Sequence, residues 1–190
     1  MSPGVVLDAS VILNLLGSGK VTTILGAIPG RRIVVEVTSG EVLRHPLEPK
    51  SDGDPLAPLV LAGLLELVTL EGAAVSRFFD LVGAEPPNDL DDGEAAALAV
   101  GESLGVRVAL DERKGRRVAS AVLPHVELAC SGSIFADAAV SAALGADLAD
   151  ALFSSLVNAR MRVLVEHDAW VRGVLGPRAA LCPSLRRRPR

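Results

Sequence analysis

Four acidic residues stand where carboxylates could act together, although they lie far apart in the chain: Asp8, Glu41, Glu94 and Asp111. Asp8 and Asp111 come directly after short apolar runs that are typical of strands buried on both faces. We expect Glu41 and Glu94 in the first turns of helices. Sites in open parallel sheets form beyond the carboxyl ends of the strands, so we expect the four acids to converge on one edge of a sheet.

Such a cluster of carboxylates predicts a bound cation. Two carboxylates about 4 Å apart repel each other by about 4 kcal/mol at an effective dielectric constant of ~20. The cluster therefore stays ionised only when a cation compensates it, and otherwise some members take up protons. Oxygen ligands without a matching set of histidines or cysteines favour Mg²⁺ or Mn²⁺ over Zn²⁺. An ion of this kind suits the activation of water for phosphodiester hydrolysis.

Each acid also has a simpler explanation when it is taken alone. Asp91 and Glu94 have the spacing of a capping box. Asp8 or Asp111 could cap the helix that follows it, and Glu41 could be a solvated helix residue. If all the acids serve in this way, the chain is a small α/β protein without a metal site.

The elements that must position the acids alternate between strand and helix. Strands are predicted at 4–7, 33–35, 67–70, 106–110 and 125–129. Helices are predicted at 11–16 with Ser10 as cap, 21–28, from about 40–43, 57–66, 74–83, 91–104, 112–121, 134–144 and 147–158. A proline-rich loop is predicted at 45–58. This alternation favours an α/β fold with a mainly parallel sheet.

Length and composition fit a single domain. The chain has 190 residues, and its 49% hydrophobic and 22% charged residues exclude intrinsic disorder. Two cysteines are typical of a reduced protein, so we expect a cytoplasmic location, with no signal peptide and no membrane span. Four of the 19 basic residues lie in 186–190, beside an otherwise acidic body. We predict one domain over 1–176 and a flexible basic tail over 177–190.

Four stretches resemble the PIN-domain family of metal-dependent ribonucleases. They are Val-Val-Leu-Asp-Ala-Ser at 5–10, Gly-Glu-Val-Leu at 40–43, Leu-Asp-Asp-Gly-Glu-Ala-Ala-Ala-Leu-Ala at 90–99 and Leu-Asp-Glu-Arg-Lys-Gly-Arg-Arg-Val-Ala at 110–119. The last two are the most specific, and they are similar to the prokaryotic branch related to toxins of toxin–antitoxin pairs. The segment 131–145 and the helices after it are similar to the C-terminal part of that branch.

The resemblance implies a Rossmann-like three-layer α/β/α sandwich and cleavage of RNA. It implies that Asp8, Glu41, Glu94 and Asp111 hold Mg²⁺ or Mn²⁺, and that Ser10 supports the first acid or a metal-bound water. It also implies a homodimer and a small antitoxin protein as partner. The fourth acid is either Asp111 or Glu112, because Ala109 replaces the usual threonine before it. Asp91 and Asp92 are also near enough to contribute.

Basic residues follow the fourth acid at Arg113, Lys114, Arg116 and Arg117. They either contact RNA phosphates or form a solvated helix face with ion pairs. The Arg-rich tail likewise either keeps the protein in solution or attracts RNA. A non-catalytic PIN-like module that binds RNA or protein is the alternative to an enzyme.

Two other motifs fail on context. The stretch 17–20 (Gly-Ser-Gly-Lys) follows a helix, and no Ser or Thr directly follows its lysine, so it is not a phosphate-binding loop. The stretch 8–10 (Asp-Ala-Ser) lacks the second aspartate of haloacid dehalogenases.

Overall fold

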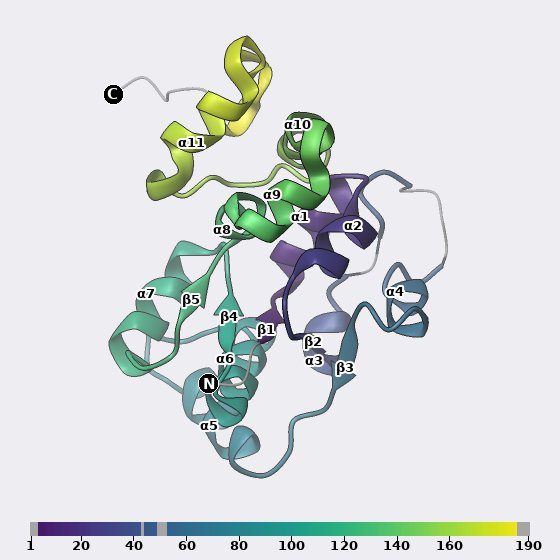
Figure 1. Cartoon of the computed structure of the whole chain (residues 1–190). Coiled ribbons are helices and arrows are strands. Elements are labelled where there is room, and N and C mark those ends of the chain that lie inside the picture. The colour runs from purple at the N-terminus through teal and green to yellow at the C-terminus, as the bar shows by residue number, and fades with distance from the viewer. Residues whose placement is uncertain (1–3, 43, 49–52, 186–190) are drawn as a thin grey trace.

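A single parallel sheet forms the centre of the molecule. In the computed structural model, which describes residues 4–42, 44–48 and 53–185, five strands lie in the order β3-β2-β1-β4-β5 (Figure 1). The strands are β1 (Gly4–Leu7), β2 (Arg31–Val35), β3 (Glu66–Val68), β4 (Arg107–Ala109) and β5 (Leu128–Ala129). The predicted α/β class and parallel sheet are confirmed. Leu7 pairs with Ala109, so the carboxyl ends of β1 and β4 lie side by side.

Helices cover both faces of this sheet and complete three layers. They are α1 (Ala9–Gly17), α2 (Val21–Ala27), α3 (Glu36–Ser39), α4 (Ala57–Leu61), α5 (Ala73–Val82), α6 (Asp92–Leu104), α7 (Arg113–Val122), α8 (Ser131–Ala136), α9 (Ala138–Leu144), α10 (Leu148–Asn158) and α11 (Val165–Leu175). Side chains of β1 alternate between two buried cores, with Leu7 facing α1, α2 and α8–α11 and Val6 facing α5–α7. Ala95, Ala96 and Ala97 are fully buried in α6, and such small side chains let the helix lie close to the strands.

The region after β2 differs from the prediction. The helix begins at once at Glu36 and ends at Ser39, so Glu41 follows α3 instead of standing in its first turns. Thr38 lies buried and donates its hydroxyl to the carbonyl of Gly93 at 3.2 Å, which ties α3 to the start of α6. This contact between distant segments fixes the short helix. Residue 43 of the predicted helical stretch 40–43 and residues 49–52 of the predicted loop lie outside the described residues.

The C-terminal region extends further than predicted. The helix α11 was not expected, and residues after it form the 3₁₀ turns η2 (Gly176–Leu181) and η3 (Pro183–Leu185). Ala179, Cys182 and Leu185 are buried in the core that contains α1. Their spacing of three residues lets one side of this segment cover that core, so the folded part extends past the predicted boundary at 176. Residues 186–190 of the predicted tail lie outside the described residues.

One segment of the described chain, Ala138–Asn158, is long and apolar enough for a membrane span by length and composition alone. It consists of α9, the 3₁₀ turn η1 (Gly145–Asp147) and α10, and Gly145 turns the chain with a φ of 51°. Side chains of both helices, among them Val140 and Leu152, are fully buried in the core. Because 33% of its most apolar window is buried inside the protein, core packing accounts for part of the apolar character of this segment.

Candidate active site

Asp8 stands at the junction of β1 and α1. Its carboxylate caps α1 and accepts hydrogen bonds from the backbone nitrogen of Ser10 at 3.2 Å and from the Ser10 hydroxyl at 2.6 Å. The helix cap is thus Asp8 and not Ser10 as predicted. Only 5% of Asp8 is exposed, although the side chain is acidic. Ser10 therefore holds the first acid in one orientation at the carboxyl edge of the sheet.

Asp111 is fixed more tightly than Asp8. It follows β4 and accepts hydrogen bonds from the side-chain amide of Asn14 at 2.7 Å and from the backbone nitrogen of Ser131 at 2.8 Å. The Ser131 hydroxyl donates a further hydrogen bond to the same carboxylate. Neither Asn14 nor Ser131 is among the site residues predicted from the sequence. A lone amide within the apolar run of α1 was the available signal for Asn14.

Glu112 has a different environment from its neighbour Asp111. Its side chain is 48% exposed and pairs with Arg162 at 2.7 Å. Asp111, by contrast, is buried and held from α1 and α8. Of the two candidates for the fourth acid, Asp111 is therefore the one that the fold orients.

Glu94 is buried without a hydrogen-bond partner for its Oε1 atom. Asp91 caps α6 and accepts a hydrogen bond from the Glu94 backbone nitrogen at 2.8 Å. Helix capping thus explains Asp91, but it does not explain the buried carboxylate of Glu94. On α7, Gly115 lies so close that a methyl group on its Cα would collide with this carboxylate. The absence of a side chain there makes room for Glu94.

Glu41 reaches the same region from the turn after α3. Its carboxylate lies against Gly93 in the first turn of α6, where a side chain on Gly93 would collide with it. The Glu41 residue is exposed, unlike the other three acids. It therefore stands at the open side of the site.

The carboxylates raise one another's pKa values. Burial, followed by the charges of Asp91, Asp8 and Glu112, raises the pKa of Glu94 to about 7. Burial and the charges of Asp91 and Asp8 also raise the pKa of Glu41. The pKa of Asp8 is raised mainly by burial, against the hydrogen bonds from Ser10. Metal-free, the site therefore favours protonated carboxylates.

The pKa of Asp111 is also raised, but other hydrogen-bond donors oppose the increase. Burial raises its pKa, while hydrogen bonds from Ser131 and Asn14 act in the opposite direction. These donors favour the ionised form of a carboxylate that burial disfavours.

These residues fit a divalent cation, although they do not form a finished cage. Within 4–42, 44–48 and 53–185, no group of three His, Cys, Asp or Glu side chains already stands around one metal position. The unpartnered Glu94 oxygen, the two glycines beside carboxylates and the mutual repulsion all favour a cation that draws the acids together. Oxygen donors alone suit Mg²⁺ or Mn²⁺.

The basic residues of α7 have separate roles. Arg116 donates to the carbonyl oxygens of Leu110 at 3.2 Å and Ala129 at 2.6 Å, so it links the ends of β4 and β5. Lys114 pairs with Asp89 at 2.9 Å, and Arg117 donates to Asn88 at 3.0 Å. Arg113, also on α7, is exposed.

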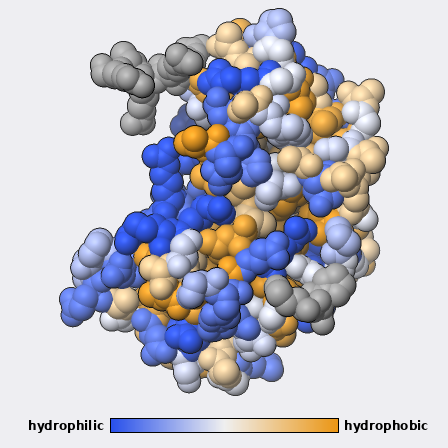
Figure 2. All heavy atoms as spheres, turned by 60° about the vertical axis from the view of Figure 1, so that its left-hand side comes forward, coloured by the Kyte–Doolittle hydropathy of each residue, from blue (hydrophilic) through white to orange (hydrophobic). Residues whose placement is uncertain are grey.

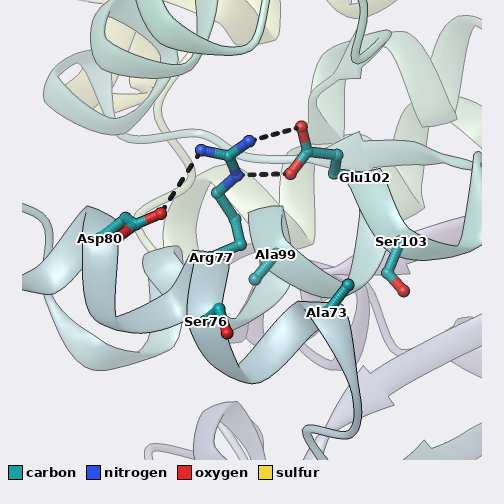
Figure 3. Close-up of a pocket in the computed structure, with 7 residues that line it drawn as sticks. All are labelled: Ala73, Ser76, Arg77, Asp80, Ala99, Glu102 and Ser103. Carbon is teal, nitrogen blue, oxygen red and sulfur yellow. Dashed lines mark hydrogen bonds and ion pairs between the residues drawn. The ribbon is translucent and has the colours of Figure 1, made fainter.

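A cavity of about 340 Å³ lies elsewhere, between α5 and α6 (Figure 3). Arg77 crosses it to pair with Glu102 at 2.6 Å, and Asp80 approaches the same guanidinium (Figure 3). None of the four acids lines this cavity. Its ionic groups are paired with one another, so it offers no comparable unpaired carboxylate.

Gly115→Ala tests the space beside Glu94. We expect the variant to fold and to lose most of the stabilisation that Mn²⁺ gives the wild type, because the methyl group displaces the Glu94 carboxylate. Thermal unfolding with and without Mn²⁺ measures this loss. The control is Gly173→Ala in α11, where no atom lies within 4 Å of the added methyl. That variant should be more stable by up to ~1 kcal/mol and keep the Mn²⁺ response. An undiminished Mn²⁺ response in Gly115→Ala would contradict the assignment of Glu94.

Comparison with known proteins identifies the fold family. A family model described as a PIN domain matches residues 4–163, which includes all four acids. Searches of curated proteins and of solved structures gave no match. The matched region ends two residues before α11 begins.

Proposed function

Because the chain belongs to the PIN-domain family, whose members are generally nucleases, we propose that it is a metal-dependent endoribonuclease. Its substrate in this proposal is RNA, and it hydrolyses phosphodiester bonds. The observation that carries the proposal is the buried Glu94 carboxylate, which has an unpartnered oxygen and shares its surroundings with Asp8 and Asp91. A protein without use for such a group would gain stability by replacing it.

The residues that would hold Mg²⁺ or Mn²⁺ are Asp8, Glu94 and Asp111, with Glu41 from the open side. When bound, the ion supplies a water of lowered pKa and neutralises charge on the phosphate. Ser10 orients the Asp8 carboxylate through two hydrogen bonds, and Asn14 and Ser131 orient Asp111. Burial of these three carboxylates keeps bulk water from competing for their oxygens.

The biological setting forms part of the same proposal. The motifs at 90–99 and 110–119 support a toxin of a toxin–antitoxin pair that acts in the cytoplasm as a homodimer and is inhibited by a small antitoxin. A non-catalytic module that binds RNA or protein is the second candidate. It is favoured by the lack of a preformed three-ligand cage in the described part of the chain.

Cleavage and metal binding should be tested together. We expect the protein to cut single-stranded RNA in Mg²⁺ or Mn²⁺ and to stop when EDTA removes the ion. We also expect Mn²⁺ to raise the unfolding temperature, because an ion that binds only the folded state stabilises it by mass action. A thermal response without cleavage of any tested RNA would favour the non-catalytic candidate. If the protein shows neither cleavage nor a thermal response to Mn²⁺, the metal site itself is overturned.

A further inference from the structure

The connection between α10 and α11 lies against the proposed active site. Arg162 pairs with Glu112 at 2.7 Å, and Glu166 pairs with Arg116 at 3.6 Å. Both pairs join this connection and α11 to the first turns of α7, directly after Asp111. The face with α7 and α11 turns toward the viewer in Figure 2, where hydrophilic side chains gather around a hollow. The connection therefore forms one border of the site.

A turn of the backbone sets the direction of Arg162. Arg160 adopts a φ of 55°, a left-handed conformation that is uncommon for residues other than glycine. The next residue, Met161, is buried to 1% exposure and anchors the chain in the core. Arg162 then emerges with 67% of its side chain exposed. The anchored turn thus presents a cation at the border of the acid cluster.

The pair of Arg162 with Glu112 contributes little to stability. Both side chains are about half exposed or more, and pairs of this kind contribute at most ~1 kcal/mol. A phosphate can replace the carboxylate, because guanidinium groups bind both in the same forked geometry. Glu112 also carries one of the charges that raise the pKa of Glu94. The Glu112 carboxylate, which pairs with Arg162, therefore interacts electrostatically with the acids of the site.

We infer that Arg162 binds a backbone phosphate of the RNA next to the acid site and exchanges Glu112 for that phosphate when RNA enters. The inference rests on the proposed function and specifies where the RNA backbone runs. In the free protein, Glu112 holds the guanidinium at the start of α7, one residue after Asp111 in the chain. In the complex, the arginine offsets the negative charge of the RNA phosphate, which the carboxylates of the site would otherwise repel.

The test measures binding of a single-stranded RNA at several salt concentrations, with Mn²⁺ and in an Asp8→Asn background so that the RNA stays intact. We expect Arg162→Gln to weaken binding about fivefold and to reduce the salt slope by about 0.7, the value for one phosphate contact on a single strand. Arg162→Lys should keep the slope. The control is Arg31→Gln, which removes an arginine paired with Glu66 at 2.6 Å at the amino end of β2. Its affinity and slope should stay unchanged.

A double-mutant cycle separates exchange from general charge effects. Glu112→Gln should tighten RNA binding by freeing Arg162, and the gain should vanish when Arg162→Gln is also present. An equal gain in both backgrounds overturns the exchange. If the wild type cleaves RNA but Arg162→Gln leaves the affinity and the salt slope unchanged, the inference alone is overturned. If the wild type neither binds nor cleaves RNA, the proposed function fails first and the inference falls with it.

Discussion

Asp8→Asn is expected to lower RNA cleavage at least about a hundredfold while the protein stays folded. Asp8 directly follows the central strand of the sheet, is 5% exposed and shares its electrostatic surroundings with Glu94 and Glu41. Asparagine has the same shape and can still accept the hydrogen bonds from Ser10 and cap α1. The substitution therefore removes one negative charge from the proposed cation site and changes little else.

The control for this experiment is Asp137→Asn. Asp137 also caps a helix, α9, and accepts a hydrogen bond from the backbone nitrogen of Ala139 at 2.9 Å. We expect this variant to cleave RNA at the wild-type rate. Initial rates in Mn²⁺, circular dichroism and thermal unfolding of all three proteins provide the comparison. Full activity of purified Asp8→Asn would remove Asp8 from the site.

Two of the acids could be placed from the sequence because local patterns fixed them. Asp8 and Asp111 follow apolar runs that are typical of buried strands, and parallel strands bring such positions to one edge. Glu94 was placed by its motif at the start of a strongly helical segment. Its missing hydrogen-bond partner depends on the approach of α7 at Gly115. The sequence around Glu94 does not show that α7 will pack against it at Gly115.

Other features depend on contacts between distant segments. Ser131 holds Asp111 from 20 residues away, and Asn14 holds it from 97 residues away. The early start of α3, which places Glu41 after the helix, goes with the bond from Thr38 to Gly93. The sequence predicts a tail for the C-terminal segment because its apolar residues are few and lie between glycine, prolines and arginines. Burial of Ala179, Cys182 and Leu185 becomes evident only when α10 and α11 are in place.

The pKa of Glu94 predicts an unusual dependence of stability on pH. Folding raises it from the ordinary 4.5 to about 7, so the folded protein binds a proton more tightly than the unfolded chain does. The stability linked to this proton is complete below pH 4.5 and is lost as the pH rises to about 7. The loss for Glu94 is on the order of 3 kcal/mol. The raised pKa values of Asp8, Glu41 and Asp111 act with the same sign.

Urea unfolding in EDTA between pH 5 and 8 measures this loss. Glu94→Gln should flatten the profile, because glutamine cannot release a proton. Glu66→Gln is the control, since pairing with Arg31 lowers the pKa of Glu66 and its titration falls below this range. Its profile should run parallel to that of the wild type. Parallel profiles for wild type and Glu94→Gln would show that the Glu94 carboxylate does not titrate as its burial requires.

Saturating Mn²⁺ should reverse the slope of the wild-type profile. A divalent cation binds ionised carboxylates, so its contribution to stability grows as the acids lose their protons. The charges that destabilise the metal-free protein near pH 7 then become the groups that bind the ion. Glu94→Gln should show a weaker reversal, because one oxygen ligand is neutral. A wild-type profile that Mn²⁺ leaves unchanged would mean that the repulsion among these acids is not relieved by a metal ion, and the non-catalytic candidate would then explain the chain better.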